Sequence, residues 1–530
     1  RDYVNAAQNN GMNALGISEH GNLFEWLHKK ECIEAAGMKY LHCVEAYLTE
    51  DNGEKVIYNA VELVHDRRIE FEKYRQREDG GYLAEVDGVS YLIDIDTLKK
   101  EYVKTRDNYH CVLIAKNYDG VKELNRLVSK SFCRDDFHFY YMPRISFDEL
   151  FKTSSNIIIT TACLGGVLNN GTPIAKEKML GFLKQNRNRC FLEIQHHNCK
   201  EQIEYNKVLY ELSKDTGIPL IAGTDTHALN EEHMDGRAML QKAKNVRFSN
   251  EDDWDLTFKT TEDLIAAYKK QNSLPMDVVY EAINNTVKMA EMVETFKLDY
   301  SPKYPKLYED SEGVFKQKIN KGVLNRNIMQ YPNYQEYLDR IHYEYDTYKH
   351  NNAIDFMLLE EDYKTEMRNR NVKFGYSRGS VSGSIIAYLL GITEVDSVKF
   401  KLNFERFMNK ERVSLADIDT DWLSEDRKTV KDYLYSKTGL YCCDIVTFNT
   451  IALKGAIRDI GRALEIPLNE VAEICDAVET NEEALRRQYK TLFKYVDLVN
   501  GVVVSVGNHP AGCVISPFPV DEWFGTFTTT

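Results

Sequence analysis

Long apolar runs, paired cysteines and an excess of positive charge are all missing from this 530-residue sequence. No apolar run approaches the ~20 residues that a membrane-spanning helix needs, and no stretch has the pattern of a signal peptide, so we predict no membrane partner. The eleven cysteines are scattered without paired spacing, which predicts reduced thiols in a cytoplasmic protein. The net charge of −15 argues against attraction of the whole molecule to nucleic acid.

Several common site motifs are also missing. The sequence contains no zinc-finger spacing, no HExxH, no Walker loop (GxxxxGK[ST]) and no dinucleotide-binding GxGxxG. Any metal or phosphate site in this sequence must therefore use residues that do not form one of these motifs. A chain of this length exceeds a single hydrophobic core, so we expect two to four domains.

Residues 1–270 repeat one arrangement, in which a short apolar strand carries a metal-type ligand at or near one end. The ligand-type residues are, in order, His20, Glu45, His110, Cys163, His196, His197, Asp225 and His227. Helical stretches such as 200–214 lie between the strands, and this alternation predicts a parallel sheet or barrel with a site at its mouth. His110 departs from the pattern because it lies at the start of its strand.

A lone His or Cys at a strand end is usually packed and hydrogen-bonded. The repetition of imidazole, thiol and carboxylate groups instead favours a site for Zn²⁺, Mn²⁺ or Fe, in which a carboxylate can bridge two ions.

The stretch GYSRGSVSGSIIAYLLG, residues 375–391, predicts a phosphate-binding loop. A Gly- and Ser-rich turn leads into an apolar helix, whose first N–H groups can hold phosphate oxygens. The alternative to phosphate binding is a purely structural role, because small residues at four-residue spacing also allow close helix packing. That alternative leaves Arg378, Ser380, Ser382 and Ser384 unexplained.

Three aspartates alternate in ADIDTDW: Asp417, Asp419 and Asp421. If the segment is a strand, all three side chains point to one face. The choice is between a solvated acidic edge and a two-metal catalytic site. Residues 367–412 carry nine basic side chains against four acidic ones directly before the triplet, and this favours catalysis.

The predicted helix over 447–464 carries Lys454, Arg458 and Arg462 at four-residue steps. A solvated face is the usual explanation of such a row. Since like charges at this spacing repel, we interpret a row without intervening acids as a contact for phosphates. The aromatic residues of the helix-rich region 271–365 are more typical of a core than of a base-stacking platform.

The first half resembles a known family. SEHGNLF, CVEAY, YHCVLIAKN, YYMPRI, TACLGG, FLEIQHH and GTDTH are similar, in order, to the PHP (polymerase and histidinol phosphatase) domain of C-family bacterial DNA polymerase III alpha subunits. The resemblance implies a (β/α)7 barrel with metal ions in its mouth, Zn²⁺ or Mn²⁺ among them, and a 3′–5′ exonuclease activity. The implied ligands are His20, Glu45, His110, Cys163, Asp225 and His227.

The second half resembles the same family. The pattern GRGSxxGS is matched by Gly379, Ser380, Gly383 and Ser384, and FERFMNKERVSLADIDTDW matches a segment that follows it. This implies a nucleotidyltransferase palm of the DNA polymerase β type, in which Asp417 and Asp419 ligate two Mg²⁺ ions. The implied nucleotide- or phosphate-binding residues include Arg378, Arg406, Arg412, Lys454, Arg458 and Arg462. GNHPAGCVIS, residues 507–516, resembles the return from thumb to palm.

The sequence also departs from the family pattern. Glu19 stands where the family has Asp, Ala416 replaces a proline, and 65–107 is longer than expected, which we interpret as a surface insertion. The family's His-x-His strand would precede Arg1, and its third palm carboxylate would follow Thr530. We therefore expect part of a longer protein of bacterial or phage origin, with both sites incomplete and no polymerisation by these 530 residues alone.

The sequence thus predicts an α/β and α+β multidomain protein, the catalytic subunit of a DNA-directed DNA polymerase. We predict a PHP domain at 1–270, a palm at 271–446, a helical thumb at 447–505 and a return to the palm at 506–530. The expected partners are primer–template DNA, dNTPs, a sliding clamp and other replisome subunits, in a bacterial or host cytoplasm. The alternatives are a stand-alone PHP phosphoesterase, which leaves 375–516 without a purpose, and a dead scaffold, which the two aspartates argue against.

Overall fold

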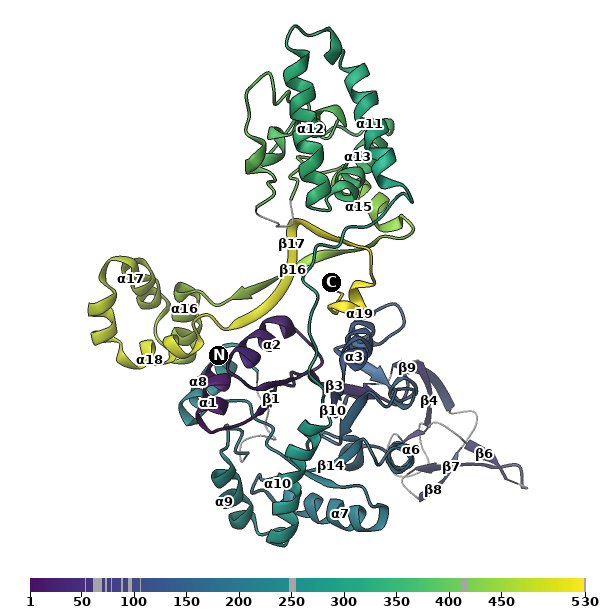
Figure 1. Ribbon diagram of the computed structural model, residues 1–530. Helices are drawn as coiled ribbons and strands as arrows, with labels where there is room; N and C mark the ends of the chain where they lie inside the picture. The colour runs from purple at the N-terminus through teal and green to yellow at the C-terminus, as the bar shows by residue number, and fades with distance from the viewer. Residues whose placement is uncertain are drawn as a thin grey trace. The chain divides into compact units, whose positions relative to one another are not determined.

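The computed structural model (Figure 1) describes residues 1–52, 54–60, 69–71, 74–77, 79–86, 89–93, 98–104, 106–246, 254–411 and 417–528. The chain forms two compact units. The first consists of Arg1–Phe296, Phe448–Val506 and Phe524–Thr530, and the second of Lys297–Thr447 and Gly507–Trp523. The domain boundaries given above remain a prediction.

The first unit contains most of the strands. They are β1 (Ala14–Gly16), β2 (Lys39–Leu41), β3 (Cys43–Thr49), β4 (Glu54–Ala60), β5 (Ile69–Phe71), β6 (Tyr74–Gln76), β7 (Tyr82–Val86), β8 (Val89–Ile93), β9 (Leu98–Lys104), β10 (Tyr109–Ala115), β11 (Phe139–Tyr140), β12 (Met142–Ser146), β13 (Ile157–Thr160), β14 (Cys190–Gln195) and β15 (Leu220–Gly223). Its helices up to Phe296 are α1 (Asp2–Asn9), α2 (Trp26–Ala35), α3 (Tyr118–Ser131), α4 (Phe147–Phe151), α5 (Val167–Asn170), α6 (Pro173–Gln185), α7 (Lys200–Thr216), α8 (Glu231–Ala243), α9 (Thr261–Gln271) and α10 (Met276–Glu291). The strands expected from the ligand pattern are confirmed as β1, β2, β3, β10, β13, β14 and β15.

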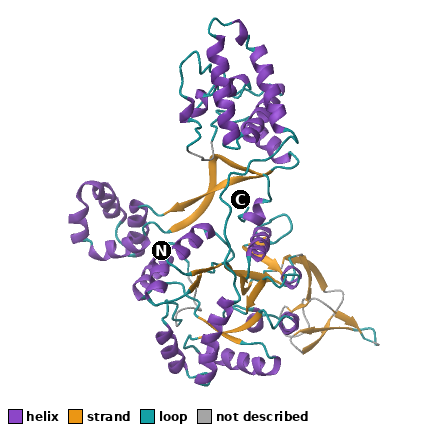
Figure 2. Ribbon diagram, viewed as in Figure 1, coloured by secondary structure: helices purple, strands orange, loops and turns teal. Residues whose placement is uncertain are grey.

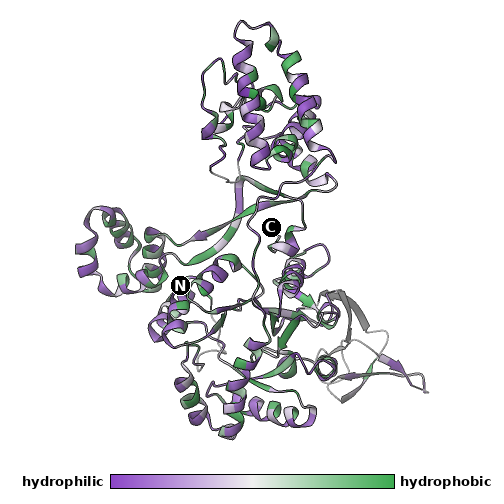
Figure 3. Ribbon diagram, in the orientation of Figure 1, coloured by the Kyte–Doolittle hydropathy of each residue, from purple (hydrophilic) through white to green (hydrophobic). Residues whose placement is uncertain are grey.

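Seven strands form the central sheet, in the order β11-β12-β3-β10-β13-β14-β15. The pairs β3–β12, β13–β14 and β14–β15 are parallel, whereas β10 runs antiparallel to both β3 and β13. Continuous apolar strands are typical of sheets covered on both faces, and all residues of β13 and β14 are buried. Figure 3 colours the central strands as hydrophobic.

The predicted parallel sheet is found only in part, because β10 runs antiparallel to β3 and β13, and β11 runs antiparallel to β12. Between β3 and β10, the described residues form two small antiparallel sheets, β5-β4-β9 and β6-β7-β8. All of these strands except β4 lie within 65–107, the region interpreted as an insertion. Within the described ranges, β11 and β15 are the ends of the seven-stranded sheet, so closure into a (β/α)7 barrel stays a prediction.

Local signals account for the helix ends in this unit. Asn117 accepts a hydrogen bond from the Gly120 N–H at the start of α3, and Thr260 forms a capping box with Asp263 at the start of α9. α7 ends at Gly217, whose φ of 69° suits a residue without Cβ.

Three helices from the later part of the chain also belong to the first unit: α16 (Leu453–Ala463), α17 (Leu468–Gln488) and α18 (Lys490–Val499). Their facing apolar stripes share a core that includes Ile457, Ile474 and Phe493, and Met239 and Leu240 of α8 pack against it. The helix expected within 447–464 is thus confirmed as α16, although residues 447–450 belong to a strand that ends at Thr450.

Phenylalanines connect distant segments of the first unit. The ring of Phe24 lies 5.6 Å from that of Phe448 and 5.0 Å from that of Phe527, and Phe527 also packs against Phe132. The indole N–H of Trp26 donates to a carbonyl oxygen 498 residues later in the chain, that of Phe524. These contacts bury apolar rings between segments that no local signal pairs.

The second unit is mainly helical, as expected for 271–365. Its helices are α11 (Ser311–Asn325), η2 (Ile328–Gln330), α12 (Tyr334–His350), α13 (Ile354–Asn369), η3 (Ser380–Gly383), α14 (Ile385–Leu389), η4 (Phe404–Arg406), α15 (Arg427–Ser436) and α19 (Val520–Trp523). Figure 2 shows helices and loops in its described part, and strand colour in β16 (Tyr441–Thr450) and β17 (Val503–Ser516), which pair with each other and have residues in both units. Its core includes Phe315, Tyr348 and Phe404. None of the helices in the described residues is long and apolar enough to cross a membrane.

Candidate metal and phosphate sites

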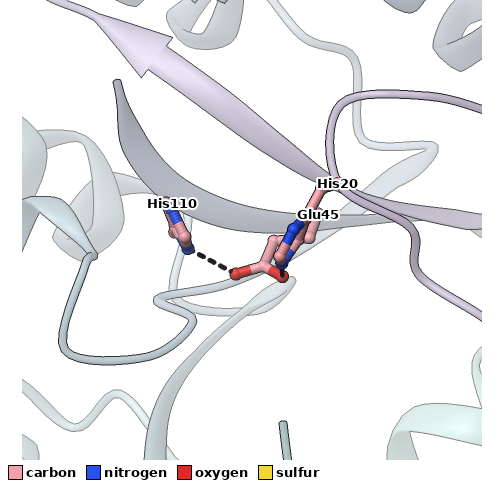
Figure 4. A group of neighbouring side chains, drawn as sticks. All are labelled: His20, Glu45 and His110. Atoms are coloured by element: carbon pink, nitrogen blue, oxygen red, sulfur yellow. Dashed lines mark hydrogen bonds and ion pairs between the residues drawn. The ribbon is translucent and has the colours of Figure 1, made fainter. Parts of the chain in front are cut away.

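A carboxylate between two imidazoles forms the centre of the first candidate site (Figure 4). Glu45 Oε2 lies 3.0 Å from His20 Nε2, and Glu45 Oε1 lies 2.8 Å from His110 Nδ1. One donor atom of each residue lies within 4.8 Å of the others. The structure therefore brings together three of the six predicted PHP ligands.

The reversed strand β10 explains why His110 belongs to this site. Val112 of β10 pairs with Thr160, the last residue of β13, so the start of β10 lies at the edge where β13 ends. In antiparallel strands, the start of one lies beside the end of the other. The apparent departure of His110 from the strand-end pattern is thus a consequence of strand direction.

The remaining predicted ligands lie next to this centre. Cys163 Sγ is 3.3 Å from His110 Nδ1 and 3.8 Å from Glu45 Oε1. The rings of His20 and His227 are 5.3 Å apart, and His227 Nδ1 is 3.7 Å from Asp225 Oδ1. Asp225 has a φ of 49°, an uncommon conformation for a residue with a side chain, and such residues often occur at functional sites.

Burial and neighbouring charges set the pKa values here. Burial raises the pKa of Glu45, but hydrogen bonds to His110 and His20 outweigh it and hold this pKa far below its usual range. Burial and the charge of Glu45 raise the pKa of Asp225, and burial with the charges of Glu45 and Asp225 raises that of the Cys163 thiol. The carboxylate between the imidazoles is therefore the permanent negative charge of the cluster.

A cavity of about 650 Å³ opens beside these residues and is lined by His20, Glu45, Cys163, Asp225 and His227, among others. Its volume is in the range typical of sites for small ligands.

Glu193 also lines this cavity, and the sequence reasoning missed it. Its carboxylate accepts hydrogen bonds from Thr160 Oγ1 at 2.5 Å and Gln195 Nε2 at 2.9 Å. Burial, with the charges of Glu45 and Asp225, raises the pKa of Glu193 to about 7. An acidic residue inside the otherwise apolar strand CFLEIQ was the signal that could have identified it.

His196 and His197, although they follow the same strand, are not among the donors of this cluster. Both are buried, and the ring of His197 stacks on Trp254 at 5.3 Å. Burial lowers the pKa of His197 to about 3, so its ring is neutral at pH 7.

The second candidate site contains the three aspartates. Asp417, Asp419 and Asp421 are exposed, whereas Ile418, Thr420 and Trp422 between them are half-buried. The expected alternation of faces is therefore confirmed. The alternation arises without a regular strand, because within 417–422 only Trp422 forms a bridge, with Phe374. Ile418 packs against the core that contains Phe315, and this apolar side anchors the segment.

Arg378 connects the aspartates to the predicted phosphate loop. Its Nη1 lies 2.7 Å from Asp421 Oδ1 and its Nε lies 4.0 Å from Asp419 Oδ2. Gly379 has a φ of 73°, and a Cβ added there would lie 3.2 Å from the Asp419 carboxylate. Glycine thus permits both the turn and the close approach of the loop to Asp419.

The second half of the predicted phosphate loop, at Gly383 and Ser384, is fixed by close backbone packing and by hydrogen bonds to a buried carboxylate. Gly383 approaches the backbone so closely that a Cβ would lie 2.4 Å from the carbonyl oxygen of Asn403. The buried carboxylate of Glu344 accepts hydrogen bonds from Ser384 Oγ and from the N–H groups of Ile385 and Ile386. The first N–H groups of α14, expected to be free for phosphate, are therefore occupied by a carboxylate.

Ser384 itself is fully buried, and its hydroxyl lies 2.7 Å from the hydroxyl of Tyr348. In this conformation Ser384 holds the loop and offers nothing to a phosphate, unlike its predicted role. Ser380 is half-buried, and Arg406 is exposed in η4. Arg412 and Ala416 lie outside the described residues.

The row of cations on α16 is partly neutralised. Lys454 Nζ lies 2.7 Å from Glu479 Oε1, and Arg462 Nη2 lies 3.8 Å from Asp459 Oδ1. The description of this row as free of acids was wrong, because Asp459 lies within it. Arg458 is exposed.

The donor atoms fit the metal ions that the sequence implied. Imidazole nitrogen with carboxylate oxygen, and a thiol nearby, is a suitable set for Zn²⁺ or Mn²⁺ in the first unit. Exposed carboxylates such as Asp417 and Asp419 supply the hard oxygen ligands that Mg²⁺ prefers in the second.

Comparison with known proteins gives two family matches. The PHP domain family matches residues 1–197, and the family described as "Bacterial DNA polymerase III alpha NTPase domain" matches residues 313–529. The first part of the chain is therefore similar to PHP domains, and the later part is similar to the NTPase domain of bacterial DNA polymerase III alpha subunits.

Curated relatives agree with these matches. The chain is 28% identical to the DNA polymerase III subunit alpha of Borreliella burgdorferi (98% of this chain, 44% of the relative), and 28% identical to that of Aquifex aeolicus (92% and 41%). It is 27% identical to that of Treponema pallidum (98% and 42%). The chain spans less than half the length of these relatives.

Proposed function

We propose that this chain is the PHP and palm portion of the catalytic subunit of a DNA-directed DNA polymerase, which adds dNTPs to a primer 3′-OH. The observation that carries the proposal is the approach of Arg378 and the Gly379 turn to the exposed aspartates. The family match over 313–529 includes this group of residues.

The proposed mechanism assigns a task to each residue. Asp417 and Asp419 would hold two Mg²⁺ ions, which when bound activate the 3′-OH and neutralise the triphosphate. Arg378 places a guanidinium group beside the same carboxylates, suited to the charge on transferring phosphates. Gly379 exposes backbone next to Asp419, so that a phosphate can approach. Arg406 and Arg412 are proposed to contact the nucleotide on the basis of the resemblance.

The proposed partners are primer–template DNA, dNTPs, a sliding clamp and other replisome subunits, in the cytoplasm of a bacterium or a phage host. The exposed Arg458, with Lys454 and Arg462, is proposed to contact phosphates of the DNA or the nucleotide.

Primer extension by the natural full-length protein tests the proposal. Wild type should extend a primed template with dNTPs and Mg²⁺, and Asp419→Ala should lose this activity. Asp432→Ala is a matched control, because Asp432 is an exposed aspartate of the same unit paired with Lys428. Equal extension by wild type and Asp419→Ala would show that the palm assignment is wrong.

A second activity is favoured by the cluster of His20, Glu45 and His110. We propose a metal-dependent 3′–5′ exonuclease in the PHP domain, in which these residues and Asp225 bind Zn²⁺ or Mn²⁺ beside the cavity. The assay is 3′ digestion of single-stranded DNA with either metal. Asp225→Ala should abolish digestion, whereas Asp235→Ala, an exposed aspartate of α8, should not. If both variants digest equally well, the exonuclease proposal is wrong.

A further inference from the structure

Tyr376 is a feature of the second unit that the proposed mechanism leaves without a role. Its side chain is 77% exposed, more than that of any other large hydrophobic or aromatic residue in the described part of this unit. A solvated tyrosine on a loop is the ordinary explanation of such exposure. The fixed backbone around Tyr376 and the nearby Arg378 and aspartates favour a binding role instead.

The backbone on both sides of the ring is fixed. The N–H of Gly375 donates to the carbonyl oxygen of Asp421 at 2.9 Å, and the carbonyl oxygen of Tyr376 accepts from the N–H of Glu394 at 2.7 Å. Glu394 is in turn paired with Arg326 at 2.7 Å and with Arg368 at 3.2 Å. An exposed ring on an anchored backbone loses less conformational freedom on binding than one on an unconstrained loop.

The hydrogen bond from Gly375 to Asp421 places the backbone next to Tyr376 beside the aspartate segment. Tyr376 follows Gly375, which contacts Asp421 through its backbone and would contact the Asp421 Cβ at 3.3 Å if it carried a Cβ of its own. Two residues later, Arg378 lies 2.7 Å from the Asp421 carboxylate. Tyr376 and Arg378 therefore share one short loop, which contacts the aspartate segment through Gly375 and Arg378.

Arg378 and the aspartates have chemistry for phosphate and metal, but not for a base. Carboxylates and a guanidinium group recognise the charged part of a nucleotide, whereas the base presents a flat aromatic face. Aromatic side chains that accept a stacked base are a general feature of single-strand and nucleotide recognition, and such stacking tolerates any sequence. The neighbouring rings of Phe374 and Trp422 are half-buried and lie 5.0 Å apart, whereas the Tyr376 ring offers an exposed aromatic surface.

We propose that Tyr376 is a stacking platform for a nucleobase at the polymerase site. The inference rests on the proposed function and adds a binding residue to it. The base belongs either to the primer terminus or to the incoming nucleotide, two sources with the same ring chemistry.

Fluorescence of 2-aminopurine, which stacking quenches, distinguishes the two sources. In one arm the probe is the 3′-terminal base of the primer, and in the other it is 2-aminopurine deoxynucleoside triphosphate offered to a primer with a dideoxy end. Both arms compare the full-length wild type with Tyr376→Ala, Tyr376→Phe and Tyr300→Ala. Tyr300, with 74% exposure, is the matched control in the same unit.

The expected result is quenching in one arm by wild type and by Tyr376→Phe, which keeps the ring. Tyr376→Ala should lose the quenching and bind that probe about tenfold more weakly. The proposal is overturned if Tyr376→Ala behaves as wild type in both arms, if Tyr376→Phe loses as much as Tyr376→Ala, or if Tyr300→Ala loses as much.

Asp419→Ala in primer extension separates this proposal from the one on which it rests. If Asp419→Ala is inactive while Tyr376→Ala binds both probes normally, only the stacking proposal fails. If Asp419→Ala extends primers as wild type does, the polymerase proposal itself fails.

Discussion

The two acidic sites of this protein are built in opposite ways. In the first unit, Glu45 is 5% exposed and lies between two imidazoles contributed by distant parts of the chain. In the second unit, Asp419 and Asp421 are 57% and 58% exposed and come from one short segment. The tertiary structure brings the residues of the first site together. In the second site, the aspartates lie on one side of a single segment because they alternate with other residues in the sequence.

The two sites stabilise their negative charges in different ways. Buried carboxylates must be paired, and Glu45 is satisfied by His20 and His110 before any ion binds. Exposed carboxylates remain hydrated, so three of them can lie close together with a single arginine nearby. The exposed site instead depends on rigid support beneath it, which Glu344 and the core around Ile418 provide.

The largest expected effect tests whether the exposed site is catalytic. Asp417→Ala should reduce primer extension about 1,000-fold, because a carboxylate that holds a metal acts directly on the transferring phosphate. Asp421→Ala should reduce it only about tenfold, since this carboxylate is paired with Arg378. Rates are measured by single-turnover extension. Equal losses in the two variants would contradict the assignment of Asp417 as a ligand.

The support beneath the exposed site should be the next most sensitive feature. Glu344→Ala removes the acceptor of Ser384 and of two backbone N–H groups, and it leaves Arg340 without its carboxylate partner. The free energy of unfolding should therefore fall by about 3 kcal/mol. Glu366→Ala, which breaks a surface pair with Arg370, should lower it by less than about 1 kcal/mol. Urea unfolding measures both. A smaller loss for Glu344→Ala than for Glu366→Ala would mean that the loop is held in another way.

In the buried site, the charge of Glu45 should dominate metal binding. Glu45→Gln keeps the shape but removes the negative charge, and the affinity for Zn²⁺ or Mn²⁺ should fall about 100-fold. Glu50→Gln is the control, because Glu50 is an acidic residue of the same region that is paired with Lys178. Titration calorimetry gives both affinities. Unchanged affinity in Glu45→Gln would exclude this carboxylate as a ligand.

The smallest effect concerns pH and the buried interior of the first unit. His42 is buried between Tyr40 and Asn125, and burial lowers its pKa to about 4. The unfolded chain therefore binds more protons than the folded one between about pH 6.5 and pH 4, and stability falls as the pH is lowered through this window. From pH 7 to pH 5 the free energy of unfolding should fall by about 2 kcal/mol on account of this residue.

The check is the same pH series in His42→Gln, which should lose this part of the pH dependence. His342, an exposed histidine of α12, provides the control variant His342→Gln, whose pH dependence should match wild type. If His42→Gln shows the same pH dependence as wild type, the titration of His42 is not its source.

Much of the fold could be predicted because its signals are local. Apolar runs such as IIIT specify buried strands, and the expected strands of the first half were found. Whether the aspartate segment is a strand could not be predicted, because alternation specifies only which side chains face the core. A strand also needs a hydrogen-bonded neighbour, and within 417–422 only Trp422 forms a bridge. The burial of Ser384 could not be predicted, because its partner Glu344 lies 40 residues away in the sequence.

By itself, the sequence determined the chemical character of both sites: imidazole, thiol and carboxylate groups in the first unit, and aspartates with glycines and arginines in the second. It also determined that Asp417, Asp419 and Asp421 face one way, since the extended backbone alternates without help from other elements. Only the tertiary structure decided that the start of β10 meets the end of β13, that Glu344 occupies the start of α14, and that Phe24 packs against Phe448 and Phe527. The physical reason is that these contacts join residues far apart along the chain, and no local preference of the backbone specifies them.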